Sequence, residues 1–306
     1  MLNFRVVAGI ILFLISLPGV IINFYVFYKL LRKSGQFSGF QKLCVSKTIP
    51  NMIVCTVFLF WSTPLCILTP EYTKIPRDLN ATLGQIAGWG AYIFGPILQV
   101  FLSINRFYVL YFPMKSMKMS TIPITNIAIS FGIIIAIIYT VIGLPNECGF
   151  VFDTEILAWR PEAYECAEWL ADFIFFSVLG LSITSNSFNF ATFLKLVFNQ
   201  VVTGVSSAEG KSRRRKRTLM YIQSVIQDSL HAFDIVNATF TYTLNDAVWF
   251  QFIFLSVSFL FIHAMDGFVM FFFHSEIHPT WLCKNQKKTS TIIIMSRSRV
   301  STLPSG

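Results

Sequence analysis

The sequence predicts an all-α membrane protein: a bundle of seven transmembrane helices, with the amino terminus outside and the carboxyl terminus in the cytoplasm. The 306-residue chain is 54% hydrophobic and only 13% charged, whereas a soluble domain carries about 25% charged residues. Its apolar residues gather in long stretches, and 33 of its residues are phenylalanine. The segments between these stretches alternate between basic and acidic. Lipid is therefore the expected solvent for most of the surface.

Seven stretches are long enough to cross a membrane, which takes about 20 largely apolar residues. They are residues 6–31, 43–68, 83–111, 124–144, 170–194, 218–244 and 247–273. The first stretch is too long for the apolar part of a signal peptide, so no cleavable leader is expected. We predict a membrane domain over residues 1–283 and a basic, Ser/Thr-rich cytoplasmic tail over residues 284–306.

The stretch 218–244 is the most polar of the seven, and the charge pattern indicates that it crosses. Basic residues gather in four segments: residues 32–33, 115–118, 211–217 and 284–288. Acidic residues gather in the intervening loops. Cytoplasmic loops are enriched in Lys and Arg, so the basic segments are predicted to lie inside. An even number of crossings must separate 211–217 from the tail. Because 247–273 is apolar enough to be one crossing, 218–244 must be the other.

The polar residues of 218–244 follow a helical geometry. At 100° per residue, most of them fall in an arc of about 120°. These are Gln223, Gln227, His231, Asp234, Asn237 and Thr241. Asp228 lies just outside the arc. An aspartate at the centre of a lipid-facing helix costs about 2.5–3.5 kcal/mol on insertion scales. We therefore predict that this helix turns its polar face toward the other helices.

Arg106 lies near the end of the third stretch, and Pro113 follows as a helix stop. Polar and aromatic side chains share its side of the helix. They are Gln85, Trp89, Tyr92, Gln99 and Ser103. Such a stripe must face other helices in lipid, so we predict that Arg106 forms the inner end of an interior polar seam. The alternative is a side chain that reaches from the helix end to the lipid phosphates.

Three further polar residues are predicted to lie at one depth. Asn23, Asn51 and Asp266 each lie about 10–12 Å above the cytosolic face, at roughly 1.5 Å per residue from the inner end of their stretch. His263 lies one turn from Asp266. We predict that these four residues form an intramembrane polar network. The alternative is a set of separate interhelical hydrogen bonds, worth about 0.6 kcal/mol each.

The loops and the tail carry candidate modification sites. Asn80 begins an N-x-[ST] sequon in the predicted first outer loop and is a candidate for glycosylation. Cys148 and Cys166 bracket the predicted second outer loop, in an oxidising compartment, and are candidates for a disulfide. Cys283 follows the last stretch and is a candidate for palmitoylation. No cysteines show a metal-ligand spacing such as C-x-x-C, so no metal site is expected.

Short segments in a fixed order along the chain carry a family resemblance. They are Ser38-Gly39-Phe40, Pro50-Asn51, Phe58–Pro64, Ile104–Phe107, Tyr111-Phe112-Pro113, Asn146-Glu147-Cys148 with Cys166, and His263–Gly267. Together with the seven stretches, these segments resemble the nematode serpentine chemoreceptors of class x (Srx), a family of seven-transmembrane G-protein-coupled receptors. The resemblance covers roughly residues 10–280.

The resemblance implies a chemosensory receptor that binds an environmental or pheromone-like small molecule outside and activates a heterotrimeric G protein inside. It also implies a glycoprotein of the plasma membrane of a sensory neuron, in contact with membrane lipid, with no enzymatic activity and no cofactor. The net charge of +9 is attributed to the cytoplasmic segments rather than to nucleic-acid binding. Asn105 and Arg106 are the candidates for G-protein coupling and switching.

We place the candidate ligand pocket in the outer half of the bundle. The residues expected there combine aromatic walls with a few polar groups, as small-molecule sites do. They are Trp89, Tyr92, Asp234, Asn237 and Trp249.

At the switch positions, the sequence departs from the rhodopsin-like receptors. Asn105 stands where those receptors usually have an acid before the arginine, and Phe107 replaces the usual tyrosine. No cysteine lies at the outer end of the third stretch, and the sixth lacks a Trp-x-Pro kink. Asp266 and Gly267 stand in place of Asn-Pro. The switch of that family therefore cannot be carried over as a set.

Two other classes of function fit single features. Intramembrane His and Asp residues also mark the ion paths of transporters and ligand-gated channels. However, we find no internal repeat and no pair of Gly/Pro-broken helices. His231 with Asp234, and His263 with Asp266, have the i, i+3 spacing of metal ligands or acid–base pairs, as in a membrane enzyme. No H-E-x-x-H or G-x-S-x-G motif accompanies them. An insect-type seven-helix channel would have its amino terminus inside, against the charge pattern.

Overall fold

The computed structural model describes residues 4–32, 39–68, 74–112, 124–145, 148–203, 208–274 and 277–278. Of these, the side chains of residue 124 and of residues 199–203 and 208–217 are not described. Contacts divide the chain into residues 1–273 and 274–306. The predicted tail over 284–306 and the palmitoylation candidate Cys283 lie outside the described residues.

The first unit consists of long helices that form seven spans. The first three spans are α1 (Phe4–Leu31), then α2 (Gly39–Val57) with η1 (Phe58–Ser62) and α3 (Thr63–Leu68), then α4 (Arg77–Gly84) with η3 (Gln85–Ala91) and α5 (Tyr92–Tyr111). The fourth, fifth and sixth are α7 (Ile124–Ile142), α8 (Glu165–Thr203) and α9 (Ala208–Thr239), the last followed by a 3₁₀ turn, η5 (Thr241–Leu244). The seventh is α10 (Val248–Gln251) with η6 (Phe252–Val257) and α11 (Ser258–Phe273). The segments η1, η3 and η6 are π-helical turns within continuous spans.

The seven predicted stretches all form helices, and three of these helices run at least five residues further than predicted. The third begins at Arg77, the fifth covers Glu165–Thr203 and the sixth begins at Ala208. Hydropathy detects only the lipid-crossing part of a helix, whereas polar residues can continue it. Lys and Arg, which dominate residues 211–217, are good helix formers.

Six of the spans in the described part of the chain are long and apolar enough to cross a membrane, and α9 is not among them. The helix α9 contains too many polar residues to meet this criterion, and it can still lie in the bundle because these residues are buried. These buried residues are Gln223, Ser224, Gln227, Asp228, His231, Asp234 and Asn237. The structure thus places the predicted polar face inside the bundle. Asp228, which the 120° arc left outside, is also buried because it packs against α8.

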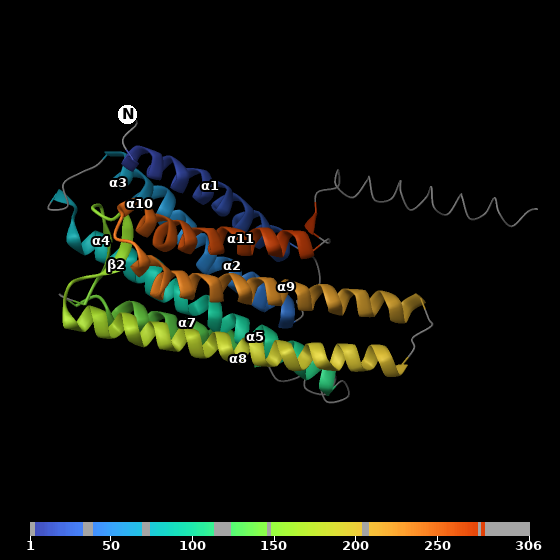
Figure 1. Ribbon diagram of the computed structural model, residues 1–306. Coiled ribbons are helices and arrows are strands. Elements are labelled where there is room, and N and C mark those ends of the chain that lie inside the picture. Colours follow the sequence, from blue (N-terminus) through green and yellow to red (C-terminus); the bar gives the residue numbers. More distant parts are fainter. Residues whose placement is uncertain are drawn as a thin grey trace, which may run out of the picture. The chain divides into compact units, whose positions relative to one another are not determined.

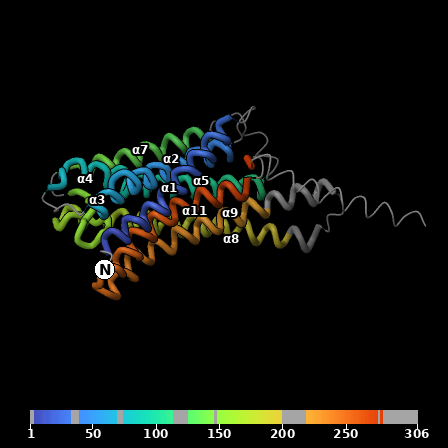
Figure 2. The backbone as a smooth tube through the Cα atoms, turned by 90° about the horizontal axis from the view of Figure 1, so that it is seen from above, coloured from blue at the N-terminus to red at the C-terminus, as the bar shows by residue number. Residues whose placement is uncertain are grey.

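The third span lies at the centre of the bundle. Its α5 contacts α2, α7, α8 and α9, while α1, α11, α9 and α8 follow one another side by side (Figures 1 and 2). On the outside, α7 exposes isoleucines such as Ile134 and Ile137, as expected for a helix whose outer face meets lipid.

A short β-hairpin closes one end of the bundle. Strand β1 (Phe150–Asp153) pairs antiparallel with β2 (Ala158–Pro161), and the hairpin contacts α4 and η6. Figure 1 shows it at one end of the bundle. Phe152, Leu157 and Trp159 are buried in the same core as residues of α1 and α2. We call this the disulfide end, because Cys148 and Cys166 are bonded there. The opposite end, where α5 ends at Tyr111, is the arginine end.

Candidate functional site

A buried ion pair joins the second and seventh spans. Nζ of Lys47 on α2 lies 2.9 Å from Oδ2 of Asp266 on α11, and the two side chains are 0% and 1% exposed. Lys47 also donates to Oε1 of Gln99 on α5 at 2.8 Å. Nε2 of Gln99 in turn donates to Oγ of Ser224 on α9 at 3.0 Å. The cluster therefore ties four spans together around one buried charge pair.

The four residues predicted as an intramembrane network contact one another beside this ion pair. Asn51 donates from Nδ2 to Oδ2 of Asp266 at 3.4 Å, and its Oδ1 lies 2.8 Å from Nδ1 of His263. Asn23 donates to the backbone oxygens of Gly19 and His263, at 2.9 and 3.2 Å. We call Lys47, Asn51, Gln99, His263 and Asp266 the central polar cluster.

Sequence reasoning missed Lys47, the cation of this cluster. A signal was present, because Lys47 precedes Asn51 by four residues and so shares its helix face. An ionisable residue inside a span is by default a functional or paired residue. Basic residues are common near the inner ends of spans, which weakens the signal from a lysine at this position.

Three of the five residues predicted for the ligand pocket lie together toward the disulfide end. Tyr92 of α5 donates its hydroxyl to Oδ2 of Asp234 on α9 at 3.2 Å. Ser258 of α11 donates to Oδ1 of Asp234 at 2.7 Å and accepts a hydrogen bond from Nδ2 of Asn237 at 3.0 Å. Phe259 packs against Tyr92, with ring centroids 5.3 Å apart. We call Tyr92, Asp234, Asn237 and Ser258 the upper polar cluster.

The two tryptophans predicted for the pocket make no hydrogen bond within the upper polar cluster. Trp89 is buried, and its ring packs against Phe150 of the hairpin at 5.6 Å. Trp249 is 50% exposed and contacts Phe250 at 5.6 Å. The structure therefore conflicts with the prediction for Trp249. The physical reason is its position in the first turn of α10, where the side chain faces outward.

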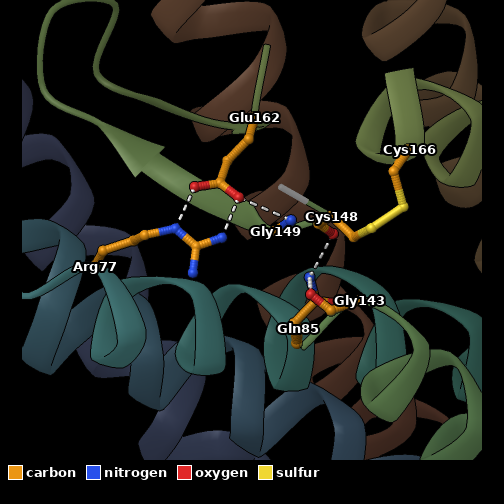
Figure 3. The surroundings of a disulfide bond; sticks show 7 residues. All are labelled: Arg77, Gln85, Gly143, Cys148, Gly149, Glu162 and Cys166. Atoms are coloured by element: carbon orange, nitrogen blue, oxygen red, sulfur yellow. Dashed lines mark hydrogen bonds and ion pairs between the residues drawn. A yellow bond between two sulfur atoms is a disulfide. The ribbon is translucent and has the colours of Figure 1, made fainter. Parts of the chain in front are cut away.

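The disulfide end is held by covalent and charged contacts (Figure 3). The bonded Cys148 and Cys166 have their Cα atoms 5.0 Å apart. Arg77 of α4 donates to both oxygens of Glu162, from Nε at 2.8 Å and from Nη2 at 2.6 Å. Oε2 of Glu162 also accepts from the backbone N of Gly149 at 2.9 Å. These contacts fix the segment between α7 and α8 against the third span.

The structure conflicts with the prediction of a glycan on Asn80. Its side chain is 1% exposed and lies in α4 rather than in an open loop. Oδ1 accepts from Trp61 Nε1 at 2.9 Å and from Phe152 N at 3.1 Å, while Nδ2 donates to Phe152 O at 3.0 Å. A glycan on Nδ2 would replace that hydrogen bond at a side chain that is closed off from the surface. Through these hydrogen bonds, Asn80 instead holds strand β1 against the third span.

Arg106 lies at the arginine end, where no described residue forms a hydrogen bond or a salt bridge with its guanidinium. The residue is 7% exposed, and no described residue accepts a hydrogen bond from Nε, Nη1 or Nη2. Its guanidinium carbon lies 5.1 Å from the ring centroid of Phe40. The residue faces a cavity of about 310 Å³. We call it the arginine-end cavity; its lining is Gly39, Phe40, Asn105, Arg106, Val109, Leu110, Thr192, Leu196, Met220 and Tyr221.

In the part of the chain that the structure describes, no group of three His, Cys, Asp or Glu side chains could hold a metal ion. His231 of α9 lies 3.9 Å from Asp266 of α11. Polar side chains from several spans meet inside the bundle, so any change in helix packing must rearrange them.

Comparisons with known proteins agree with this geometry. The crystal structure of squid rhodopsin matches with a TM-score of 0.70 and 12% sequence identity, over 95% of this chain and 86% of the rhodopsin chain. At 12% sequence identity, this similarity is evidence for the fold alone. A search of curated proteins finds no match. The sequence profile described as "Serpentine type 7TM GPCR chemoreceptor Srx" matches residues 13–274. The chain belongs to the Srx family of serpentine, seven-transmembrane G-protein-coupled chemoreceptors.

Proposed function

We propose that this receptor binds an environmental or pheromone-like small molecule at its disulfide end and activates a heterotrimeric G protein at its arginine end. The disulfide end then faces outward from the plasma membrane of a sensory neuron, and the arginine end faces the cytoplasm. The positive-inside charge pattern supports this orientation. The family supports a receptor rather than an enzyme.

The arginine-end cavity is the observation that carries the proposal. Arg106 holds a full charge there, and no described residue accepts a hydrogen bond from its guanidinium. Burying a charge without a partner costs several kcal/mol, as an order of magnitude. Such a cost is tolerated where a binding partner supplies the missing acceptor, as a docking G protein does in this proposal.

One face of α5 supports a connection between the two ends. Tyr92, Gln99 and Arg106 are seven residues apart, so they lie on nearly the same side of the helix. Tyr92 belongs to the upper polar cluster and Gln99 to the central one. A ligand that favours one packing of α5 against α9 and α11 shifts the population toward it, in proportion to its difference in affinity. Arg106 moves with the same helix.

A reporter assay tests this function. The receptor is expressed in cells with a promiscuous Gα subunit and exposed to a panel of odorants and pheromone extracts. We expect at least one fraction to raise the reporter in wild-type cells and to have no effect in cells expressing Arg106→Ala at equal surface level. An equal response in Arg106→Ala cells would rule out the coupling site. Tags on both ends, stained on intact cells, test the orientation; staining of the carboxyl terminus would contradict it.

A further inference from the structure

The cavity beside Arg106 contains a cation and no described anion to pair with it. Its three guanidinium nitrogens are buried without hydrogen-bond acceptors among the described residues, and its described lining contains no carboxylate. Asp228 of α9 is close enough to attract Arg106 but accepts no hydrogen bond from it, and its Oδ2 accepts from Ser185 and Asn189 of α8. The ring of Phe40 offsets only part of the cost, since a cation–π contact is worth about 0.5–2 kcal/mol by general estimate. An anion with at least two acceptor oxygens would complete the site.

Most of the other lining residues are apolar and suited to contact with hydrocarbon. Phe40, Val109, Leu110, Leu196 and Met220 present apolar surface to the cavity. Thr192 adds little polarity, because its hydroxyl donates to the backbone oxygen of Phe188 at 2.8 Å. The volume of about 310 Å³ lies near the lower limit of small-molecule pockets. A small inorganic anion would leave most of this apolar surface without contacts.

We propose that the arginine-end cavity binds a small anionic amphiphile, whose carboxylate or phosphate head group pairs with Arg106 and whose short hydrocarbon chain contacts the apolar lining. Arginine binds both head groups through two parallel N–H···O bonds. Because the proposed G protein docks on the same arginine, the bound amphiphile competes with it. Only this competition rests on the proposed function; binding does not.

Binding is measured on purified receptor in nanodiscs, with no G protein present. The probe is radiolabelled decanoate, and its displacement is followed by scintillation proximity. Unlabelled decyl phosphate carries the same chain on the other head group, decanol carries the chain without a charge, and acetate carries the charge without a chain. We expect decanoate and decyl phosphate to displace the probe, and decanol and acetate to fail. Displacement by decanol at the same concentration as decanoate would overturn the proposal.

Three variants assign the binding to this cavity. Arg106→Met removes the charge and should weaken decanoate binding about tenfold or more. Leu196→Trp fills the cavity while keeping Arg106, and should also abolish binding. Lys195→Met is the matched control, because Lys195 is a cation at the same end that stacks on Tyr111 and does not line the cavity. It should bind as the wild type does. Wild-type binding by Leu196→Trp, or equal loss in Lys195→Met, would overturn the site even if Arg106→Met fails to fold.

G-protein nucleotide exchange then separates this site from the proposed function. We expect decanoate to lower exchange by the wild-type receptor and to leave exchange by Leu196→Trp unchanged. If decanoate binds but no exchange occurs under any condition, the proposed function fails and the site stands. If exchange occurs and decanoate does not bind, or occupation of the site leaves exchange unchanged, the inference fails and the proposed function stands.

Discussion

Two buried cations of this receptor, Lys47 and Arg106, have opposite surroundings. Lys47 forms an ion pair with Asp266 at 2.9 Å and a hydrogen bond with Gln99 at 2.8 Å. Arg106 contacts the face of Phe40 and has no described acceptor for any guanidinium nitrogen. A paired charge in a low-dielectric interior holds its helices in place, whereas an unpaired one remains available for a binding partner. In our proposal, Lys47 therefore acts on stability and Arg106 on signalling.

The largest effect is expected from removing Lys47, which breaks its ion pair with Asp266. Lys47→Met leaves Asp266 as a buried, uncompensated carboxylate and removes a donor from Gln99. Losing one partner of a buried ion pair destabilises a protein by about 3–5 kcal/mol. We expect a lower unfolding temperature of the purified receptor in nanodiscs, together with lower surface expression.

The double variant Lys47→Met, Asp266→Met is the control for that experiment. Replacing both charges by apolar groups removes the uncompensated charge, so most of the stability should return. A double variant no more stable than Lys47→Met would show that the ion pair is not what holds these spans.

Asn80 is a neutral buried residue whose side chain, like that of Lys47, is hydrogen-bonded, so its loss should also reduce stability. Asn80→Leu leaves the Trp61 indole nitrogen and both polar atoms of the Phe152 backbone without partners. Each buried polar group left unpaired costs about 1–3 kcal/mol. We expect a lower unfolding temperature, and no change in gel mobility when wild-type receptor is treated with a glycosidase. A mobility shift that Asn80→Leu abolishes would contradict the burial of this side chain.

The upper polar cluster should show a smaller effect on the ligand response. Tyr92→Phe and Asn237→Ala each remove one interhelical hydrogen bond, worth about 0.5–1.5 kcal/mol. We expect the half-effective dose of an active fraction to rise about 2- to 10-fold at equal surface expression. Trp249→Phe is the control, because Trp249 lies outside the cluster and is exposed. Unchanged potency in both cluster variants would remove these residues from the ligand response.

The smallest effect is expected from placing a negative charge beside Arg106. Asn105 lies beside Arg106 and also lines the cavity. Asn105→Asp should lower basal G-protein output, because a carboxylate paired with Arg106 stabilises the resting packing by about 0.5–1 kcal/mol. Basal output measured at matched surface expression checks this. Higher basal output in Asn105→Asp would indicate that the added charge favours the active packing.

Much of the fold could be predicted from the sequence, because lipid imposes strong patterns. A span must be long and apolar, and polar residues at helical spacing must face the bundle. The polar face of α9 and the contacts among Asn51, His263 and Asp266 followed from such patterns. Helix ends beyond the lipid, as at Ala208 in α9, did not, because hydropathy does not detect them.

The rest depends on contacts between distant segments. The sequon at Asn80 predicts a glycan only if the residue is exposed, and its burial depends on strand β1 about 70 residues later. Sequence reasoning predicted no strands in this loop, whose hairpin packs into the helical core. The pairing of Lys47 with Asp266 joins residues more than 200 positions apart, so no local pattern specified it. Trp249 was misplaced because composition gives no direction for a side chain in the first turn of a helix.

One measurement tests the contrast between the two cations most directly: unfolding temperature and G-protein nucleotide exchange on the same preparations of wild type, Lys47→Met, Arg106→Ala and Arg106→Lys. The contrast predicts that Arg106→Ala unfolds no lower than the wild type, because it removes a buried charge that has no described hydrogen-bond acceptor, yet supports no exchange. Lys47→Met should unfold well below both. If Arg106 were only a lipid anchor, Arg106→Lys would retain full exchange. Full exchange by Arg106→Ala, or a loss of stability as large as that of Lys47→Met, would contradict the assignment of Arg106 to the G-protein site.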